Sequence, residues 1–449
     1  MVNNLLESLK TILLSRHCCV AYSGGLDSHV LLHVMSELQQ QHPEFQCRAM
    51  HINHGLHPHA DVWEAHCQQT CLDVGIDFIA YKVQLDIQPG DSVEAVAREA
   101  RYKKFSELLL SEECLLTAHT RNDQAETLLL QLLRGAGVKG LAAMPAKKSF
   151  APGYLLRPFL KMTRDTLYEY AKKNGLVWIE DDSNLELRFD RNYVRHHIIP
   201  ALQQRWPNLL TTLTRSADHC AETAELIDEL ADQDLQSIQG DRKTALRLEP
   251  FFQLSPARQR NALRRWISWN GYQVPSTKQL EHIFKNVLQA SEDAVPEMRC
   301  GQAEIRRFRQ QLFLVSPLPH PDNTQRVFWD LHSPLTLPYD LGKLMMYKVK
   351  GMGLSAELDA TKINVRFRCG GERFCPAGRE GTQSLKKLFQ EWNIPPWQRD
   401  CIPLIYYADE LIAVVGYGIN KNYLVGKDQM GMDIRWLCAM EAANAGDMK

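Results

Sequence analysis

The sequence of 449 residues has almost no net charge, since 52 lysine and arginine residues are balanced by 53 aspartate and glutamate residues. It therefore lacks the global basic excess that many nucleic-acid-binding proteins carry, and any polyanion must bind local patches. The longest apolar run, at 411–419, is much shorter than the roughly 18 residues of a membrane-spanning helix. Glu7 and Lys10 interrupt the first apolar residues at helical spacing, which predicts an amphipathic helix and no signal peptide. We expect a cytoplasmic protein without a membrane partner.

The chain also lacks the common cysteine motifs. Its 12 cysteines include no Cys-x-x-Cys pair, so we expect reduced and mostly buried thiols. Histidines recur at His51, His54, His57 and His59, but their spacing and an intervening glycine and proline match no zinc pattern. We interpret them as loop histidines near a ligand crevice, with metal ligation as the weaker alternative.

The most informative segment is a glycine loop between an apolar run and a run of helical period. The apolar run at 18–22 predicts a strand, and the periodicity from 30 to 38 predicts a helix. Two glycines let backbone N–H groups crowd around an anion, and a helix N-terminus favours negative charge. We expect the segment to bind nucleotide phosphates; it consists of Ser23, Gly24, Gly25, Leu26, Asp27 and Ser28.

The carboxylate in this loop needs its own explanation. Asp27 would repel phosphates, so we predict that it is a ligand for the Mg²⁺ that accompanies the nucleotide. The segment is not a Walker loop, because it lacks the four-residue spacer and the Gly-Lys-Ser/Thr end. A plain strand-to-helix turn is the alternative, and the acid together with the flanking periodicity disfavours it.

Strands alternate with amphipathic helices from residue 18 to about residue 118. Strands are expected at 18–22, 47–52, 78–83 and 114–118. This alternation predicts an α/β fold with a doubly wound parallel sheet. Ligands bind beyond the carboxyl ends of such strands. Because His54 and His119 both follow strand ends, we expect them to converge with the glycine loop on one crevice.

Two acids and two arginines are further candidates for this crevice. Asp123 and Glu126 are three residues apart, on one helical face, and could hold magnesium or orient an attacking amine. Acids that face a helix macrodipole are the common alternative. Arg98 and Arg101 share a face of the helix predicted at 92–110, where either could clamp a phosphate or remain solvated.

Basic residues also recur later in the chain. Arg188, Arg191 and Arg195 follow an acidic loop at intervals of three and four, so a helix would place them on one face that could bind RNA phosphate or the leaving pyrophosphate. A charge-balanced surface helix is the alternative. The stretch 362–387 mixes arginine, lysine and aromatic residues as RNA binding requires, although alternation of strand faces explains part of that pattern.

The rest of the chain predicts two smaller α+β domains. A long helix at 209–238 leads to helices at 256–269 and 277–288 and to strands within 297–315; a linker with three prolines follows at 316–323. The C-terminal part should contain strands around 327–331, 343–349, 363–368, 403–407 and 411–415 and a helix at 383–392. We divide the chain into a catalytic domain at 1–210, a helical linker at 211–240, a middle domain at 241–318 and a C-terminal domain at 324–440.

These residues carry a family resemblance. The segment SGGLDS resembles the PP-loop of the ATP pyrophosphatases, which cleave ATP between its α and β phosphates and transfer AMP. Nearly the whole chain resembles the tRNA(Ile)-lysidine synthetase family. The shared motifs are HxNHGL at 51–56, REARYxxF at 98–105, NDQAETLLLxLLRGAGxxGLxxM at 122–144, RPFL at 157–160, the WIEDxSN to RNxVRxxIIPxL block at 178–202, and a C-terminal block with GGE at 370–372, GR at 378–379, LKKLF at 385–389 and PPWQRD at 395–400.

The resemblance implies a ligase that joins free L-lysine to the wobble cytidine of the isoleucine tRNA with anticodon CAU, through an adenylated cytidine. ATP and Mg²⁺ would be the cofactors, and Asp27, Asp123 and Glu126 the catalytic residues. Arg101 and His119 would join SGGLDS in binding ATP. The residues expected to contact tRNA are His54, Arg191, Arg195, Arg379, Lys386 and Lys387. The two C-terminal domains would bind the tRNA, and a homodimer is a further expectation.

Two alternatives remain at this point. Another PP-loop enzyme, such as a tRNA thiolase, would share the ATP chemistry, but thiolases generally need a cysteine pair or a metal knuckle that this chain lacks. A non-catalytic RNA-binding module could keep ATP as a structural ligand, although Asp27, Asp123 and Glu126 argue against it. RNA-dependent release of pyrophosphate would exclude that module.

Overall fold

The computed structural model describes residues 17–90, 92–182, 186–291, 294 and 296–437. The expected first helix lies outside these residues. The chain forms two compact units, Met1–Ile227 and Asp228–Lys449. The division into four parts stays a prediction. Within the described residues, no helix has the length and apolar character to cross a membrane.

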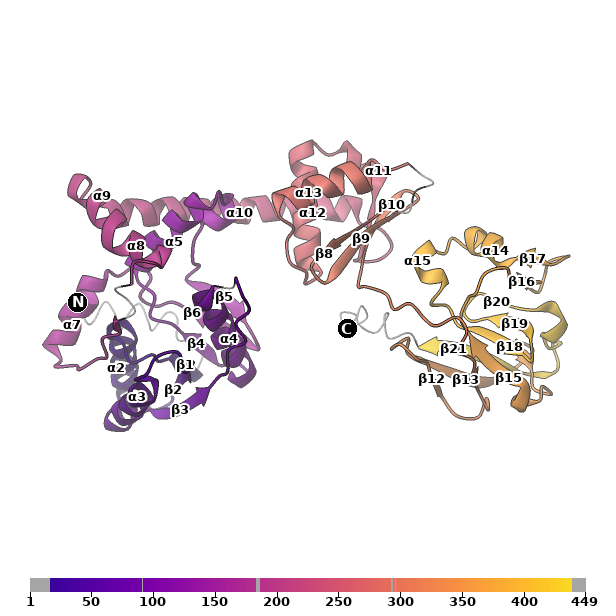
Figure 1. Cartoon of the computed structure of the whole chain (residues 1–449), viewed down its shortest axis with the longest axis horizontal. Helices are drawn as coiled ribbons and strands as arrows, with labels where there is room; N and C mark the ends of the chain where they lie inside the picture. The colour runs from indigo at the N-terminus through magenta and orange to yellow at the C-terminus, as the bar shows by residue number, and fades with distance from the viewer. Residues whose placement is uncertain (1–16, 91, 183–185, 292–293, 295, 438–449) are drawn as a thin grey trace. The chain divides into compact units, whose positions relative to one another are not determined.

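The first unit is built on a six-stranded sheet of order β3-β2-β1-β4-β6-β5 (Figure 1). All neighbours are parallel except the β5–β6 pair. The strands are β1 (His17–Ala21), β2 (Gln46–Asn53), β3 (Asp77–Lys82), β4 (Cys114–Leu116), β5 (Lys147–Phe150) and β6 (Gly153–Leu156). The four expected strands are confirmed, whereas the hairpin β5–β6 was not predicted from the sequence.

Helices cover both faces of this sheet. In β1, Cys18 and Val20 point into a core with α2, α3 and α7, whereas Cys19 points into a core with α4. The helices of the unit are α2 (Leu26–Gln41), α3 (Ala60–Val74), α4 (Val93–Leu108), α5 (Arg121–Leu133), α6 (Val138–Leu141), α7 (Arg164–Lys173), α8 (Asp190–Tyr193), the π-helical turn η2 (Val194–Ile198) and α9 (Ile199–Arg205). The doubly wound α/β prediction is therefore confirmed.

The long helix α10 (Leu209–Ile238) has the predicted bounds and continues from the first unit into the second. The following elements are β7 (Ala245–Arg247), α11 (Leu248–Gln253), α12 (Pro256–Trp269), α13 (Thr277–His282), the π-helical turn η3 (Ile283–Leu288), β8 (Glu297–Cys300), β9 (Ala303–Phe308) and β10 (Gln311–Val315). The strands form an antiparallel sheet of order β7-β10-β9-β8. Its core surrounds the fully buried Trp266, whose indole N–H donates to the carbonyl of Lys243 at 2.9 Å.

The remaining part of the second unit is mostly β structure. Its elements are β11 (Val327–Phe328), β12 (Leu335–Thr336), β13 (Lys343–Lys350), β14 (Leu354–Ser355), η4 (Ala360–Lys362), β15 (Ile363–Arg366), β16 (Arg373–Phe374), β17 (Gln383–Ser384), α14 (Leu385–Glu391), α15 (Pro396–Arg399), β18 (Leu404–Tyr407), β19 (Glu410–Val414), β20 (Gly418–Ile419), η5 (Lys421–Tyr423) and β21 (Met430–Leu437). They form sheets of order β11-β15-β18-β19-β20 and β12-β13-β21-β14 and the pair β16-β17.

Three sequence predictions in this part were wrong in their bounds. The helix expected at 383–392 begins only at Leu385, because the two preceding residues pair with β16 as a strand. The strand expected at 327–331 ends at Phe328, and the strand expected at 363–368 ends at Arg366. The long strand β21 was missed, although it pairs along the whole of β13.

Candidate active site

The glycine loop forms a tight turn between β1 and α2. Gly24 has a φ of +83°, a conformation that favours glycine. A Cβ atom there would lie 2.5 Å from Ile179 Cδ1 and 2.9 Å from Cys67 Sγ. The carbonyl of Gly24 also accepts a hydrogen bond from the backbone N–H of Ile179 at 2.9 Å. Both the backbone angle and the packing therefore exclude a side chain at this position.

Two serines brace the loop from within. The Ser28 hydroxyl donates to the carbonyl of Gly25 at 3.0 Å and accepts from the backbone N–H of Ser23 at 3.3 Å. The Ser23 and Ser28 hydroxyls are 3.0 Å apart. Gly25 is the N-cap of α2, and no side chain caps the helix. The first N–H groups of α2 thus keep the anion-binding character of a helix N-terminus.

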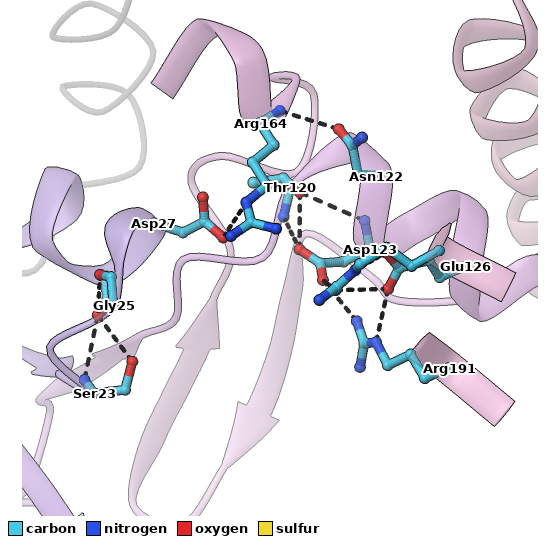
Figure 2. Close-up of polar contacts among 11 residues, drawn as sticks. Ser23, Gly25, Asp27, Thr120, Asn122, Asp123, Glu126, Arg164 and Arg191 are labelled. Carbon is cyan, nitrogen blue, oxygen red and sulfur yellow. Dashed lines mark hydrogen bonds and ion pairs between the residues drawn. The ribbon is translucent and has the colours of Figure 1, made fainter. Parts of the chain in front are cut away.

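Asp27 lies in the first turn of α2 and is only partly neutralised. Its Oδ2 is 3.9 Å from Arg164 Nε, whereas its Oδ1 is buried and has no hydrogen-bond partner among the described residues (Figure 2). Burial raises the pKa of Asp27 to about 6, an effect that Arg164 opposes and nearby Asp123 reinforces. A buried carboxylate oxygen without a partner fits a cation that arrives with a ligand.

Asp123 and Glu126 are held by two arginines from the segment that follows the acidic loop. Arg191 donates to Glu126 Oε2 and to Asp123 Oδ1, both at 2.7 Å (Figure 2). Arg195 donates to Glu126 Oε1 at 2.6 Å and Oε2 at 2.9 Å, and reaches Asp123 Oδ1 at 3.3 Å. Glu126 is only 1% exposed. The four side chains form one largely buried, charge-balanced cluster, which we call the crevice cluster.

The N-terminus of α5 fixes the second oxygen of Asp123. Thr120 is the N-cap, and its backbone N–H and hydroxyl donate to Asp123 Oδ2 at 2.7 and 2.8 Å. Burial alone would raise the pKa of Asp123, but Arg191 and the Thr120 hydrogen bonds outweigh it and lower the pKa. Asp123 therefore stays ionised at neutral pH.

Two histidines and two arginines lie around the same crevice. Burial lowers the pKa of His119 to about 3, and nearby arginines add to this effect. Burial, with Arg101 adding to it, lowers the pKa of His54 to about 4. Both rings are therefore neutral at physiological pH. Within the described chain, His54 Nδ1 and Arg157 Nε are buried without a hydrogen-bond partner, as is Asp27 Oδ1. Three such atoms in one crevice are available to a water, an ion or a ligand.

The structure brings the predicted crevice residues of the first unit together. Electrostatic interactions link Asp27 to Asp123, Glu126 and Arg195, and they link Arg101 to Arg191. The prediction of Arg188 on one helical face with Arg191 was wrong, because Arg188 precedes α8 and pairs with Glu186.

Sequence reasoning missed three contributors to the crevice. Arg164 lies next to Asp27, Arg157 interacts with His119, and Ile179 packs against Gly24. All three come from segments distant in sequence from the glycine loop. For Arg157 and Ile179 the sequence offered a signal, because they belong to the family motifs RPFL and WIED. For Arg164 it offered none.

The remaining predicted site residues belong to the second unit. Arg379 pairs with Glu391 and is 43% exposed. Lys386 and Lys387 lie on the exposed face of α14. In the described part of the chain, neither lysine forms an ion pair, so their charges are available to a ligand.

The sequence of the first unit matches a family model. Residues 1–202 match the PP-loop domain. The braced glycine turn at the N-terminus of α2, at the carboxyl edge of a parallel sheet, is the structural counterpart of that match. The fold and the site thus define a PP-loop ATP-binding protein.

Family models and relatives cover the rest of the chain as well. Residues 246–313 match the TilS substrate binding domain, and residues 363–436 match the TilS substrate C-terminal domain. The chain is 54% identical over 430 residues to the tRNA(Ile)-lysidine synthase of Coxiella burnetii, covering 96% of this chain and 95% of the relative. It is 43% identical over 424 residues to that of Serratia proteamaculans, covering 94% and 95%. The chain belongs to the tRNA(Ile)-lysidine synthase family.

Proposed function

We propose that the protein joins L-lysine to the wobble cytidine of tRNA(Ile) with anticodon CAU in an ATP-dependent reaction. The carbonyl oxygen of the base attacks the α phosphorus of ATP, and pyrophosphate leaves. The side-chain amine of lysine loses a proton and attacks the activated base carbon, and AMP leaves. The tRNA would then decode AUA instead of AUG and accept isoleucine instead of methionine. The match to tRNA(Ile)-lysidine synthases over nearly the whole chain carries this proposal, and the unpaired Asp27 oxygen beside the Gly24 turn supports its ATP-binding step.

The loop residues Ser23, Gly24, Gly25, Leu26, Asp27 and Ser28 would bind the ATP phosphates. The free N–H groups of α2 supply preorganised donors, which stabilise the charge that develops on the leaving pyrophosphate. Mg²⁺ usually binds through one or two carboxylates together with phosphate oxygens, and the orphan oxygen of Asp27 fits that need. When bound, the ion would neutralise phosphate charge. Arg101 and the neutral His119 are the further candidates for contact with ATP.

Asp123 and Glu126 would bind or orient the amine of lysine. Both acids are held in one orientation by Arg191 and Arg195, and Arg191 lowers the pKa of Asp123. Each of their oxygens already accepts a hydrogen bond, so an ammonium group must share these oxygens with the arginines. Arg191 and Arg195 would contact the tRNA or a phosphate near the reacting base. His54 would also contact the tRNA. The wobble base must leave its stack to reach such a buried site.

The exposed cations of the second unit are proposed as tRNA contacts. Phosphate contacts make affinity depend on salt, because bound counterions are released. Replacing Lys386 or Lys387 by alanine should therefore weaken tRNA binding and reduce the slope of log affinity against log salt by about one. Filter binding at several salt concentrations measures this slope. An unchanged slope in both variants would remove these lysines from the interface.

The decisive experiment is the mass of the product tRNA. Incubation with ATP, lysine and CAU-anticodon tRNA(Ile) should add one lysyl group, and methionine tRNA with the same anticodon should stay unchanged. Asp27→Ala should abolish the gain. A gain of sulfur in place of lysine would revive the thiolase alternative, and no gain in any tRNA would refute the proposal.

Two further expectations belong to this proposal. We place the reaction in the cytoplasm, where uncharged tRNA and free lysine occur. The homodimer stays a prediction, which sedimentation equilibrium of the full chain would test.

A further inference from the structure

The second unit contains a cavity of about 470 Å³ that the proposed chemistry does not use. This volume lies in the range of pockets for small ligands, about 300–1,000 Å³. Its wall is formed by the loop after β16, by the end of α14, by the β19–β20 turn and by β21. The lining residues that matter here are Pro376, Arg379, Trp392, Tyr417 and Asp433.

Two aromatic rings dominate one wall of this cavity. Trp392 and Tyr417 are stacked, with ring centroids 5.6 Å apart and an interplanar angle of 18°. Phe374 and Phe389 contact Trp392 from the core side and hold its ring in place. Tyr417 is 41% exposed. The stack therefore presents one supported aromatic surface to a ligand.

The turn that carries Tyr417 packs against the cavity wall. Gly416 has a φ of +81°, and a Cβ atom on Gly418 would lie 3.7 Å from both Pro376 and Trp392. The backbone N–H of Tyr417 donates to the carbonyl of Val414 at 3.0 Å. Since the turn is packed and hydrogen-bonded, the ring needs little reorganisation to accept a stacked partner.

The cavity wall itself carries little net charge. Its two charged residues, Arg379 and Asp433, pair with Glu391 and Arg435. Two exposed lysines, Lys386 and Lys387, lie on α14, the helix that ends at Trp392. In the portion of the chain that the structure covers, neither lysine has an ion-pair partner.

We propose that this cavity binds one unpaired nucleobase of the tRNA, stacked on Tyr417, with the lysines on the neighbouring phosphates. The inference rests on the proposed function, because it assumes a tRNA substrate. Base stacking on aromatic side chains combined with lysine contacts to the backbone is the usual way to bind a single-stranded segment. Bases within A-form helices cannot reach such a pocket, so only unpaired nucleotides qualify.

The test replaces Tyr417 in the full chain. Tyr417→Ala should raise the Kd and the KM for tRNA by about 5- to 150-fold, the range that corresponds to the loss of one stacked base. The KM values for ATP and lysine and kcat at saturating tRNA should stay unchanged. Tyr417→Phe keeps the ring and should bind tRNA like the wild type.

Phe328→Ala is the matched control. Phe328 is an exposed aromatic of the same unit that lines a different cavity of about 380 Å³. This variant should bind tRNA like the wild type. A second measurement is ultraviolet crosslinking of wild-type protein to tRNA, which should yield a crosslinked peptide that contains Tyr417.

The outcomes separate this inference from the proposed function. If the wild type lysinylates tRNA but Tyr417→Ala binds tRNA as tightly as the wild type, the pocket does not hold a base. The same conclusion follows if Tyr417→Phe loses as much affinity for tRNA as Tyr417→Ala. Crosslinks that map only elsewhere would contradict it in the same way. If the wild type binds no tRNA, both the proposed function and this inference fail.

Discussion

Two clusters in this protein both pair carboxylates with arginines but differ in their surroundings. The crevice cluster joins Asp123 and Glu126 to two arginines. In the second unit, Arg265 of α12 pairs with Asp232 and Asp228 of α10, and Arg258 pairs with Asp234, which is 1% exposed. We call this second set the helix cluster.

The difference lies in the polar groups next to each cluster. Beside the crevice cluster, Asp27 Oδ1 and His54 Nδ1 are buried without partners. In the helix cluster, by contrast, no buried side-chain polar atom lacks a partner among the described residues. Ion pairs alone thus do not indicate function. Unsatisfied buried neighbours are the more informative signal, because a buried polar atom without a protein partner needs a water, an ion or a ligand.

The largest effect on activity is expected at Asp27. Asp27→Asn keeps the size of the side chain but removes the charge that would bind Mg²⁺ and position ATP. We expect kcat to fall by about 10²- to 10³-fold, as for other losses of electrostatic stabilisation. Single-turnover formation of adenylated tRNA measures the rate of this step. A wild-type rate in this variant would show that the Asp27 carboxylate has no role in catalysis.

The same variant should be more stable than the wild type. Burial raises the folded-state pKa of Asp27 from 3.8 to about 6, so wild-type stability falls as pH rises through this interval. At pH 7 without ligands, we expect Asp27→Asn to gain about 1 to 3 kcal/mol, and the gain should vanish below pH 4. Urea unfolding at pH 4, 5, 6 and 7 tests this trend. A constant difference at all four values would contradict it.

Glu126→Gln should reduce both stability and activity. It removes the charge of a buried carboxylate that accepts hydrogen bonds from two largely buried arginines, and breaking comparable buried pairs costs about 3 to 5 kcal/mol. Asp234→Asn in the helix cluster is the matched control, since Asp234 is likewise a buried carboxylate paired with an arginine. Both variants should melt at lower temperature, but only Glu126→Gln should lose kcat when assayed well below its Tm. Equal losses of kcat would remove the distinction between the clusters.

A smaller effect is expected at Gly24. Gly24→Ala combines the left-handed backbone cost of about 1 to 2 kcal/mol with a clash against Ile179 and Cys67. Gly75→Ala is the control, because Gly75 has a φ of +70° and open space around its Cβ position. The difference in unfolding free energy between the two variants isolates the packing term. Gly24→Ala should also raise the KM for ATP, whereas Gly75→Ala should not.

The smallest effect is expected at Arg265. Its side chain is 30% exposed, so Arg265→Gln should cost no more than about 1 kcal/mol and leave kcat and all KM values unchanged. Thermal melting and steady-state kinetics check both points. A loss of activity would show that the helix cluster also serves function, for example by transmitting tRNA binding.

Much of the fold was predictable from local patterns. The strands from His17 to Leu116 and the helices α10 and α12 follow from apolar periodicity. Each of these elements is long or buried enough to need a regular pattern of apolar residues. Short strands such as β16 and β17 were not predictable. Two-residue strands have no period, and only their partners define them.

The site shows the same division. The glycine loop, Asp123 and Glu126 were recognisable because their residue types and spacing suit phosphate and amine chemistry. Arg164 was not recognisable, since an arginine at the start of α7 looks like any solvated cation until the fold places it beside Asp27. The pairing of Arg191 with Glu126 was likewise invisible to helical spacing.

The sequence by itself determined the order of elements, the phosphate-binding loop and the family. These features depend on residues that are near one another in the chain, so short-range periodicity and motif spacing encode them. Only the tertiary structure decided which charges neutralise one another, which oxygen of Asp27 is left free, and that Trp392 and Tyr417 form one stacked surface. Those properties depend on distances between remote segments, which packing sets and no local pattern records.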